Sequence, residues 1–152
     1  DKELLRARVI RRLRQVMNLG KRYDVKVLIE NVGLRTKNNV LFDLPEYVAL
    51  FDIFPQAGAL LDTGHAHVNG WDIPAVVKAL GERLAACHVH DNDGNGDAHL
   101  PVGQGDIDWK AYFGAVKKYA PQATQVFEYC CGFNNTKDLE AHIAELKEDY
   151  KL

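Results

Sequence analysis

The chain has 152 residues, 47% of them hydrophobic and 26% charged, with a formal net charge of −2 and a pI near 6.3. These values are ordinary for one globular domain and exclude the strongly basic composition that favours nucleic acid as a partner. The sequence contains no 18-residue apolar run and no visible signal peptide, and Cys87, Cys130 and Cys131 are too badly spaced for a disulfide framework. We therefore expect no membrane span and a cytoplasmic location.

Helices and short apolar strands alternate along the chain. Residues 1–22 predict a helix, because apolar residues recur at three- and four-residue steps, and Gly20 is expected to cap its end. Residues 25–31 predict a strand that is almost continuously apolar, as in a parallel sheet covered by helices. The later elements are expected to be a loop at 36–43, a helix at 45–54, a strand at 57–62, a rim loop at 64–70, a helix at 73–84, a strand at 85–90, a long polar loop at 91–107, a helix at 108–119, a strand at 124–129 and a helix at 136–152.

This order is one helix followed by four βα units, with no linker that would divide residues 1–152. It predicts an α/β fold of the TIM-barrel type, a half-barrel of parallel strands with outer helices in a single domain. A complete (β/α)₈ barrel needs roughly 200 residues or more, so the chain supplies the strands of half a barrel.

Every predicted strand ends in a residue that can bind a metal ion. Glu30, Asp62, His88 and Glu128 follow one another at spacings of 32, 26 and 40 residues, each long enough for a loop, a helix and a return loop. The carboxyl ends of parallel strands meet at one rim of a barrel, so these four side chains are expected to converge. A single strand-end carboxylate can equally face solvent or cap a helix, but the coincidence of four favours a divalent cation site for Mn²⁺, Mg²⁺, Co²⁺ or Zn²⁺.

Further polar residues flank this predicted cation site. His65 follows Asp62 closely enough to reach the same point, and His88 and His90 share one face of a strand by its period of two. Asp97 and His99 form a D-x-H motif in the long loop, where they can hold a second metal ion or contact substrate. A pair of hydrogen-bonded core histidines and an ordinary polar loop are the alternatives.

Five segments of the chain resemble a known family. They are LIEN (28–31), LDTGH (61–65), HVHDND (88–93), GDAHLPVGQGDIDW (96–109) and FE (127–128). Together they are similar to the C-terminal half of the sugar phosphate isomerase/epimerase group, the xylose isomerase-like TIM barrels that also include endonuclease IV. The resemblance covers essentially the whole chain, and the run over 96–109 is its most specific part.

The resemblance implies a role for each site residue. Glu30, Asp62, His88 and Glu128 match the family's catalytic metal site, where Mn²⁺ is the first expectation. Glu30 and Glu128 would act as the catalytic base and acid. His65, His90, Asp97 and His99 are expected to contact substrate. In the endonuclease branch, His65 and the D-x-H motif would hold further zinc.

The implied activity is isomerisation or epimerisation of a sugar or sugar phosphate by proton transfer through an enediolate. A hydride-shift isomerase of the same fold is not separated from this by the sequence. One alternative is an endonuclease IV-like zinc phosphodiesterase acting at abasic DNA sites. The other is an inactive half-barrel fragment. A half-barrel leaves two strand edges open, so a homodimer that closes the barrel is expected.

Overall fold

Four short parallel strands form one sheet in the order β1-β2-β3-β4 in the computed structural model, which describes residues 1–151. The strands are β1 (Leu28–Glu30), β2 (Gly58–Asp62), β3 (Leu84–Val89) and β4 (Thr124–Phe127). The α-helices are α1 (Lys2–Tyr23), α2 (Leu44–Ile53), α3 (Thr63–Val68), α4 (Ile73–Leu80), α5 (Trp109–Tyr119) and α6 (Thr136–Tyr150), with 3₁₀ turns η1 (Arg35–Lys37) and η2 (Gly81–Arg83). The predicted half-barrel of parallel strands and outer helices is confirmed.

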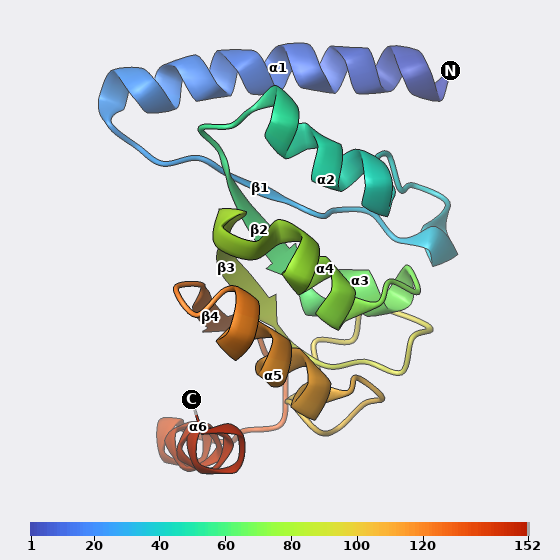
Figure 1. Ribbon diagram of the computed structural model, residues 1–152. Helices are drawn as coiled ribbons and strands as arrows, with labels where there is room; N and C mark the ends of the chain where they lie inside the picture. The colour runs from blue at the N-terminus through green and yellow to red at the C-terminus, as the bar shows by residue number, and fades with distance from the viewer. Residues whose placement is uncertain (152) are drawn as a thin grey trace.

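Helices α2, α4 and α5 lie side by side over one face of the sheet, with α1 beyond α2 at one end and α6 beyond α5 at the other (Figure 1). The core lies between this face and these helices. It consists of side chains that are at most 2% exposed, chiefly Tyr47, Phe51, Ala59, Leu61, Val76, Val77, Leu84, Cys87, Val89, Tyr112 and Phe113. Because side chains alternate along a strand, Leu60 and Asp62 face the side away from Leu61 and the helices. The side of the sheet that carries the predicted ligand Asp62 is therefore the interior side of the half-barrel.

The outer edges of β1 and β4 have no strand partner among residues 1–151. On β4, Val126 alternates with the partly buried Phe127 and is 41% exposed on the interior side. Among the same residues, every helix is too short or too polar to cross a lipid bilayer.

Helix α1 extends beyond its predicted end. Gly20 is buried inside the helix, and Asp24 ends it in the left-handed conformation, φ 53°, with its backbone N–H on the Gly20 carbonyl. A Cβ at Gly20 would lie 2.7 Å from both the Val25 carbonyl oxygen and Val27 Cγ2. The glycine therefore allows the start of β1 to fold back closely against α1, and the prediction of Gly20 as the cap was wrong.

The segment predicted as a rim loop at 64–70 is largely the short helix α3. Asp62 begins this helix by accepting a hydrogen bond from the His65 backbone N–H at 2.7 Å. The next helix ends at Leu80 rather than at 84, because Gly81 turns the chain at φ 51°. Leu84 then opens β3, and η1 occupies part of the predicted loop at 36–43. The predicted last residue of α6, Leu152, lies outside the described residues.

Candidate metal centre

The four predicted ligands converge at the carboxyl ends of the strands. Glu30 and Asp62 end β1 and β2, His88 lies one residue before the end of β3, and Glu128 follows β4 directly. His88 Nδ1 lies 3.7 Å from Glu30 Oε1, 3.8 Å from Asp62 Oδ2 and 3.4 Å from Glu128 Oε2. One atom from each of Glu30, Asp62 and His88 lies within 4.8 Å of the other two. Ligands bound at about 2.0–2.3 Å to one ion lie roughly 3–4 Å apart, so Glu30, Asp62 and His88 are spaced as ligands of a common cation would be. Glu128 lies near this group through His88, and it also forms a second possible group with His90 and His99.

The charge of this group also suits a cation. Glu30, Asp62 and Glu128 bring three carboxylates around one imidazole. Partial burial, and next the charge of Asp62, raise the pKa of Glu30 above its ordinary value even though His88 and His65 act to lower it. The cluster therefore holds more negative charge than its own histidines compensate, and a divalent ion would supply the missing positive charge.

Contacts between neighbouring strands align these ligands. Asn31 and Asp62 exchange two hydrogen bonds, from the Asn31 amide to the Asp62 carbonyl at 3.0 Å and from the Asp62 N–H to Asn31 Oδ1 at 2.7 Å. The Thr63 hydroxyl lies 3.1 Å from the His88 carbonyl oxygen and 3.0 Å from that of His90. The backbone N–H of Glu128 donates to the Val89 carbonyl at 3.1 Å. Each strand end is therefore held by the next unit along the chain.

Asp62 is the least accessible of the four predicted ligands, with its side chain 1% exposed. Its Oδ1 caps α3, and His90 Nε2 lies 3.1 Å from both of its carboxylate oxygens. Burial on its own would raise the pKa of Asp62, but the hydrogen bond from His90 and the nearby charges of His90 and His65 hold that pKa below its ordinary value. The carboxylate is therefore ionised and oriented before any ligand arrives.

A second cluster lies beside the first. Asp97 Oδ2 lies 3.3 Å from His65 Nε2 and 3.3 Å from His99 Nε2. His65 Nδ1 donates to the Asn31 carbonyl at 3.0 Å, and His99 Nδ1 donates to the Glu128 carbonyl at 3.0 Å. Since each Nδ1 is committed to a carbonyl, the neutral form of either imidazole would present the lone pair of its Nε2 to the carboxylate. A proton or a cation between them is needed to stabilise this arrangement.

His90 occupies a different environment from the other three residues predicted to contact substrate. Its side chain is completely buried, whereas those of His65, Asp97 and His99 are 16%, 21% and 30% exposed. Its ring stacks on His99 with the centroids 3.9 Å apart and the planes at 8°. Ring nitrogens bind metals in the plane of the ring, so His90 and His99 cannot both bind one ion from this stacked position.

The predicted long loop is organised by Asp91, which the sequence interpretation left without a role. Asp91 is completely buried, and its carboxylate accepts hydrogen bonds from the backbone at Asn92, Gly103 and Ile107 and from Trp109 Nε1. Its backbone also pairs with Leu100 in both directions. An aspartate directly after an apolar strand and before a glycine-rich loop was the signal that could have identified it. Asp91 thereby positions the segment that carries Asp97 and His99.

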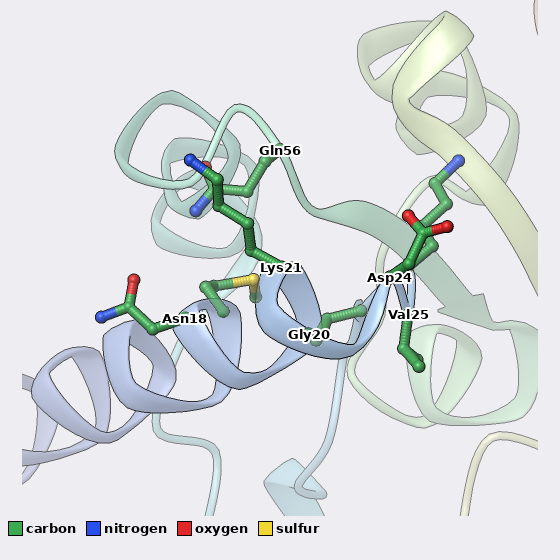
Figure 2. A pocket seen from close by; sticks show the side chains of 9 residues that line it. Asn18, Gly20, Lys21, Asp24, Val25 and Gln56 are labelled. Atoms are coloured by element: carbon green, nitrogen blue, oxygen red, sulfur yellow. The ribbon is translucent and has the colours of Figure 1, made fainter.

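A separate pocket of about 660 Å³ lies at the opposite end of the strands, where β1 and β2 begin. Figure 2 shows Lys21 and Gln56 on one side of it and Asp24 and Val25 on the other. None of the predicted site residues lines this pocket, and the candidate chemistry therefore lies elsewhere.

The chain is similar over most of its length to parts of longer proteins. The chain is 29% identical over 113 residues to the uncharacterized protein MJ1614 of Methanocaldococcus jannaschii, which covers 72% of this chain and 42% of that protein. It is 32% identical over 95 residues to the uncharacterized protein y4fM of Sinorhizobium fredii, covering 61% of this chain and 30% of that protein. The chain thus spans less than half the length of these relatives.

A solved structure shares the fold. A D-tagatose 3-epimerase-like protein superposes with a TM-score of 0.72 at 23% identity, over 93% of this chain and 52% of that chain. The sequence profile of the xylose isomerase-like TIM barrel matches residues 1–148. The protein therefore belongs to the xylose isomerase-like TIM-barrel family.

Proposed function

We propose that this chain carries the cation-binding half of a metal-dependent sugar isomerase or epimerase. The observation that supports this most is the convergence of Glu30, Asp62, His88 and Glu128 from four strand ends, with Glu30, Asp62 and Glu128 all within 3.8 Å of His88 Nδ1. These four residues would hold the ion, with Mn²⁺ as the proposed metal and Co²⁺, Zn²⁺ or Mg²⁺ as alternatives. A bound ion would act as a Lewis acid on adjacent carbonyl and hydroxyl oxygens of a sugar.

The two glutamates are proposed to move the proton. Glu30 and Glu128 reach His88 from the two outer strands of the sheet, so they flank the space between them. One carboxylate would take the proton from the carbon next to the carbonyl group, and the other would return a proton. Return to the same carbon from the opposite face gives epimerisation, whereas return to the former carbonyl carbon gives isomerisation. Partial burial of Glu30, which raises its pKa, suits the role of a base.

The more exposed histidines are proposed to bind the substrate. His65 and His99 lie at the rim with Asp97 between them, at 3.3 Å from each. Imidazole and carboxylate groups at this position can hydrogen-bond the hydroxyl groups of a sugar or sugar phosphate. The free thiols of Cys87, Cys130 and Cys131 support the proposed cytoplasmic location, where disulfides rarely form.

The cluster of His65, Asp97 and His99 favours a second candidate function, an endonuclease IV-like zinc phosphodiesterase acting at abasic DNA sites. Two lone pairs and one carboxylate converge at His65, Asp97 and His99, which is a donor set suited to zinc. More than one zinc ion bound per chain, together with cleavage of abasic DNA, would favour this candidate over the sugar enzyme.

The decisive experiment is proton exchange at the substrate carbon. The purified chain is stripped with a chelator, its binding of Mn²⁺ is measured by calorimetry, and ketoses are incubated with it in D₂O and followed by NMR. Deuterium at the carbon next to the carbonyl, present with Mn²⁺ and lost in Glu128→Gln, is the expected result. Exchange that persists undiminished in Glu128→Gln would refute the assigned proton transfer.

We also propose that a second copy of the chain closes the half-barrel. The open edges of β1 and β4, and the exposed Val126 on the interior side of the sheet, support this arrangement. A two-fold axis would pair β1 of one copy with β4 of the other and β4 with β1, which leaves no open edge.

A further inference from the structure

We infer that His90 is a positioning residue, which fixes the carboxylate of Asp62 for cation binding and does not touch the substrate itself. This inference rests on the proposed function, because it assigns the His90 role through the proposed metal ligand Asp62. It also changes the role expected for His90 from the sequence, which was direct contact with substrate.

The first step concerns the proton on the imidazole. His90 Nε2 lies 3.1 Å from Asp62 Oδ1 and 3.1 Å from Asp62 Oδ2. An ionised carboxylate only accepts hydrogen bonds, so Nε2 must carry the proton and share it between the two oxygens. His90 Nδ1 is buried and has no hydrogen-bond partner among the described residues. Asp97 Oδ1 lies 3.9 Å from Nε2, which is beyond hydrogen-bond distance, so among the described residues the hydrogen bonds of this ring go to Asp62.

The second step concerns the rigidity of the ring. On one side it stacks on His99, with the centroids 3.9 Å apart. Elsewhere it presses so closely on Gly64 that a Cβ there would overlap His90 Cε1 and Nδ1. The backbone is held as well, because the His90 N–H donates to the Thr63 hydroxyl at 3.2 Å. The donor on Nε2 thus has one direction available to it, toward Asp62.

The third step is the effect on the ligand. Two donors hold the Asp62 carboxylate. His90 Nε2 lies within hydrogen-bond distance of both oxygens, whereas the His65 backbone N–H donates to Oδ1 and does not reach Oδ2. Without His90, Asp62 Oδ2, the oxygen 3.8 Å from His88 Nδ1, would lose its hydrogen-bond donor. Partners that orient a ligand in this way typically change metal affinity by about 10–100-fold when they are removed.

Two substitutions separate positioning from packing. His90→Phe keeps the ring and its stacking on His99 but removes the donor, whereas His90→Gln keeps an N–H donor and removes the ring. His142→Phe, on α6 outside the two clusters, is the matched control. Calorimetric titration with Mn²⁺ is expected to show affinity about 10–100-fold weaker in His90→Phe, and within about threefold of wild type in His90→Gln and His142→Phe.

The other outcomes are each decisive. Equal weakening in His90→Phe and His90→Gln would mean that His90 acts through packing alone, and unchanged affinity in His90→Phe would mean that Asp62 needs no donor there. Either result overturns the inference and leaves the proposed metal site standing. A wild-type chain that binds neither Mn²⁺, Co²⁺ nor Zn²⁺ would instead overturn the proposed function, and the inference with it.

A measurement on the wild-type chain covers the case in which His90→Phe fails to fold. Long-range ¹H–¹⁵N NMR of the metal-free protein distinguishes the two imidazole tautomers. We expect His90 to carry its proton on Nε2 with slow exchange against solvent. A proton on Nδ1 alone would place no donor on Asp62 and would overturn the inference.

Discussion

The buried carboxylate of Asp91 provides a quantitative test of how the long loop is held. Its Oδ2 accepts from the Gly103 N–H at 2.9 Å and from Trp109 Nε1 at 2.7 Å, while Oδ1 accepts from Asn92 and Ile107 at 2.9 and 3.3 Å. Asp91→Asn keeps the shape of the side chain but replaces one oxygen by an NH₂ group, so two donors lose their acceptor. Hydrogen bonds to charged groups contribute about 1.5–3 kcal/mol each, which predicts a loss of about 4 kcal/mol.

Urea unfolding followed by circular dichroism measures this loss, with an unchanged m-value expected because the same surface is exposed on unfolding. In thermal unfolding, about 3 °C per kcal/mol for a chain of this size predicts a decrease of about 12 °C. Asp93→Asn is the control, since Asp93 is exposed and its carboxylate accepts hydrogen bonds from Asn95. If Asp91→Asn lost no more stability than Asp93→Asn, the carboxylate would not be holding the loop.

Three further predictions concern the ligands and the open sheet. Glu128→Gln should weaken Mn²⁺ binding by at least tenfold with an unchanged circular dichroism spectrum, and unchanged binding would remove Glu128 from the proposed ligand set. The raised pKa of Glu30 means that the folded state holds this proton more tightly than the unfolded state, so this group lowers stability as pH rises above 4.5. Glu30→Gln should therefore make the metal-free protein more stable at pH 7. In urea unfolding, the midpoint of the variant should decrease less between pH 4.5 and pH 7 than that of the wild type. An equal or lower midpoint of the variant at pH 7 would contradict this. Val126→Glu places a charge on the exposed interior side of β4 and should shift sedimentation from dimer toward monomer; a wild-type monomer at micromolar concentration would refute the proposed pairing.

The strand ends, and the convergence of the predicted ligands there, were predictable from the sequence because their signals are local. Glu30, Asp62 and His88 each lie at or beside the end of a short apolar run, and parallel pairing brings such ends together whatever the details of the loops. The predicted order of one helix and four βα units is confirmed for the same reason. The roles of these residues in catalysis and binding remain predictions.

The missed features depend on contacts between distant segments. Glycine is the residue type most common at helix C-caps, which is why Gly20 was predicted as one. In the structure it lies inside α1, where its missing side chain allows close packing against Val25 and Val27. The burial of His90 and its stacking on His99 depend on the path of the loop, which the sequence does not specify.

The contacts that align the ligands have a consequence for the inheritance of this fold. Each runs between one unit and the next, from Asn31 to Asp62, from Thr63 to His88 and from Val89 to Glu128. A genetic crossover ahead of β1 would transmit all three alignments together, whereas one between β2 and β3 would combine Thr63 of one parent with the His88 and His90 carbonyls of another. The four predicted ligands therefore keep their mutual alignment when the segment from β1 to Glu128 is exchanged as one piece.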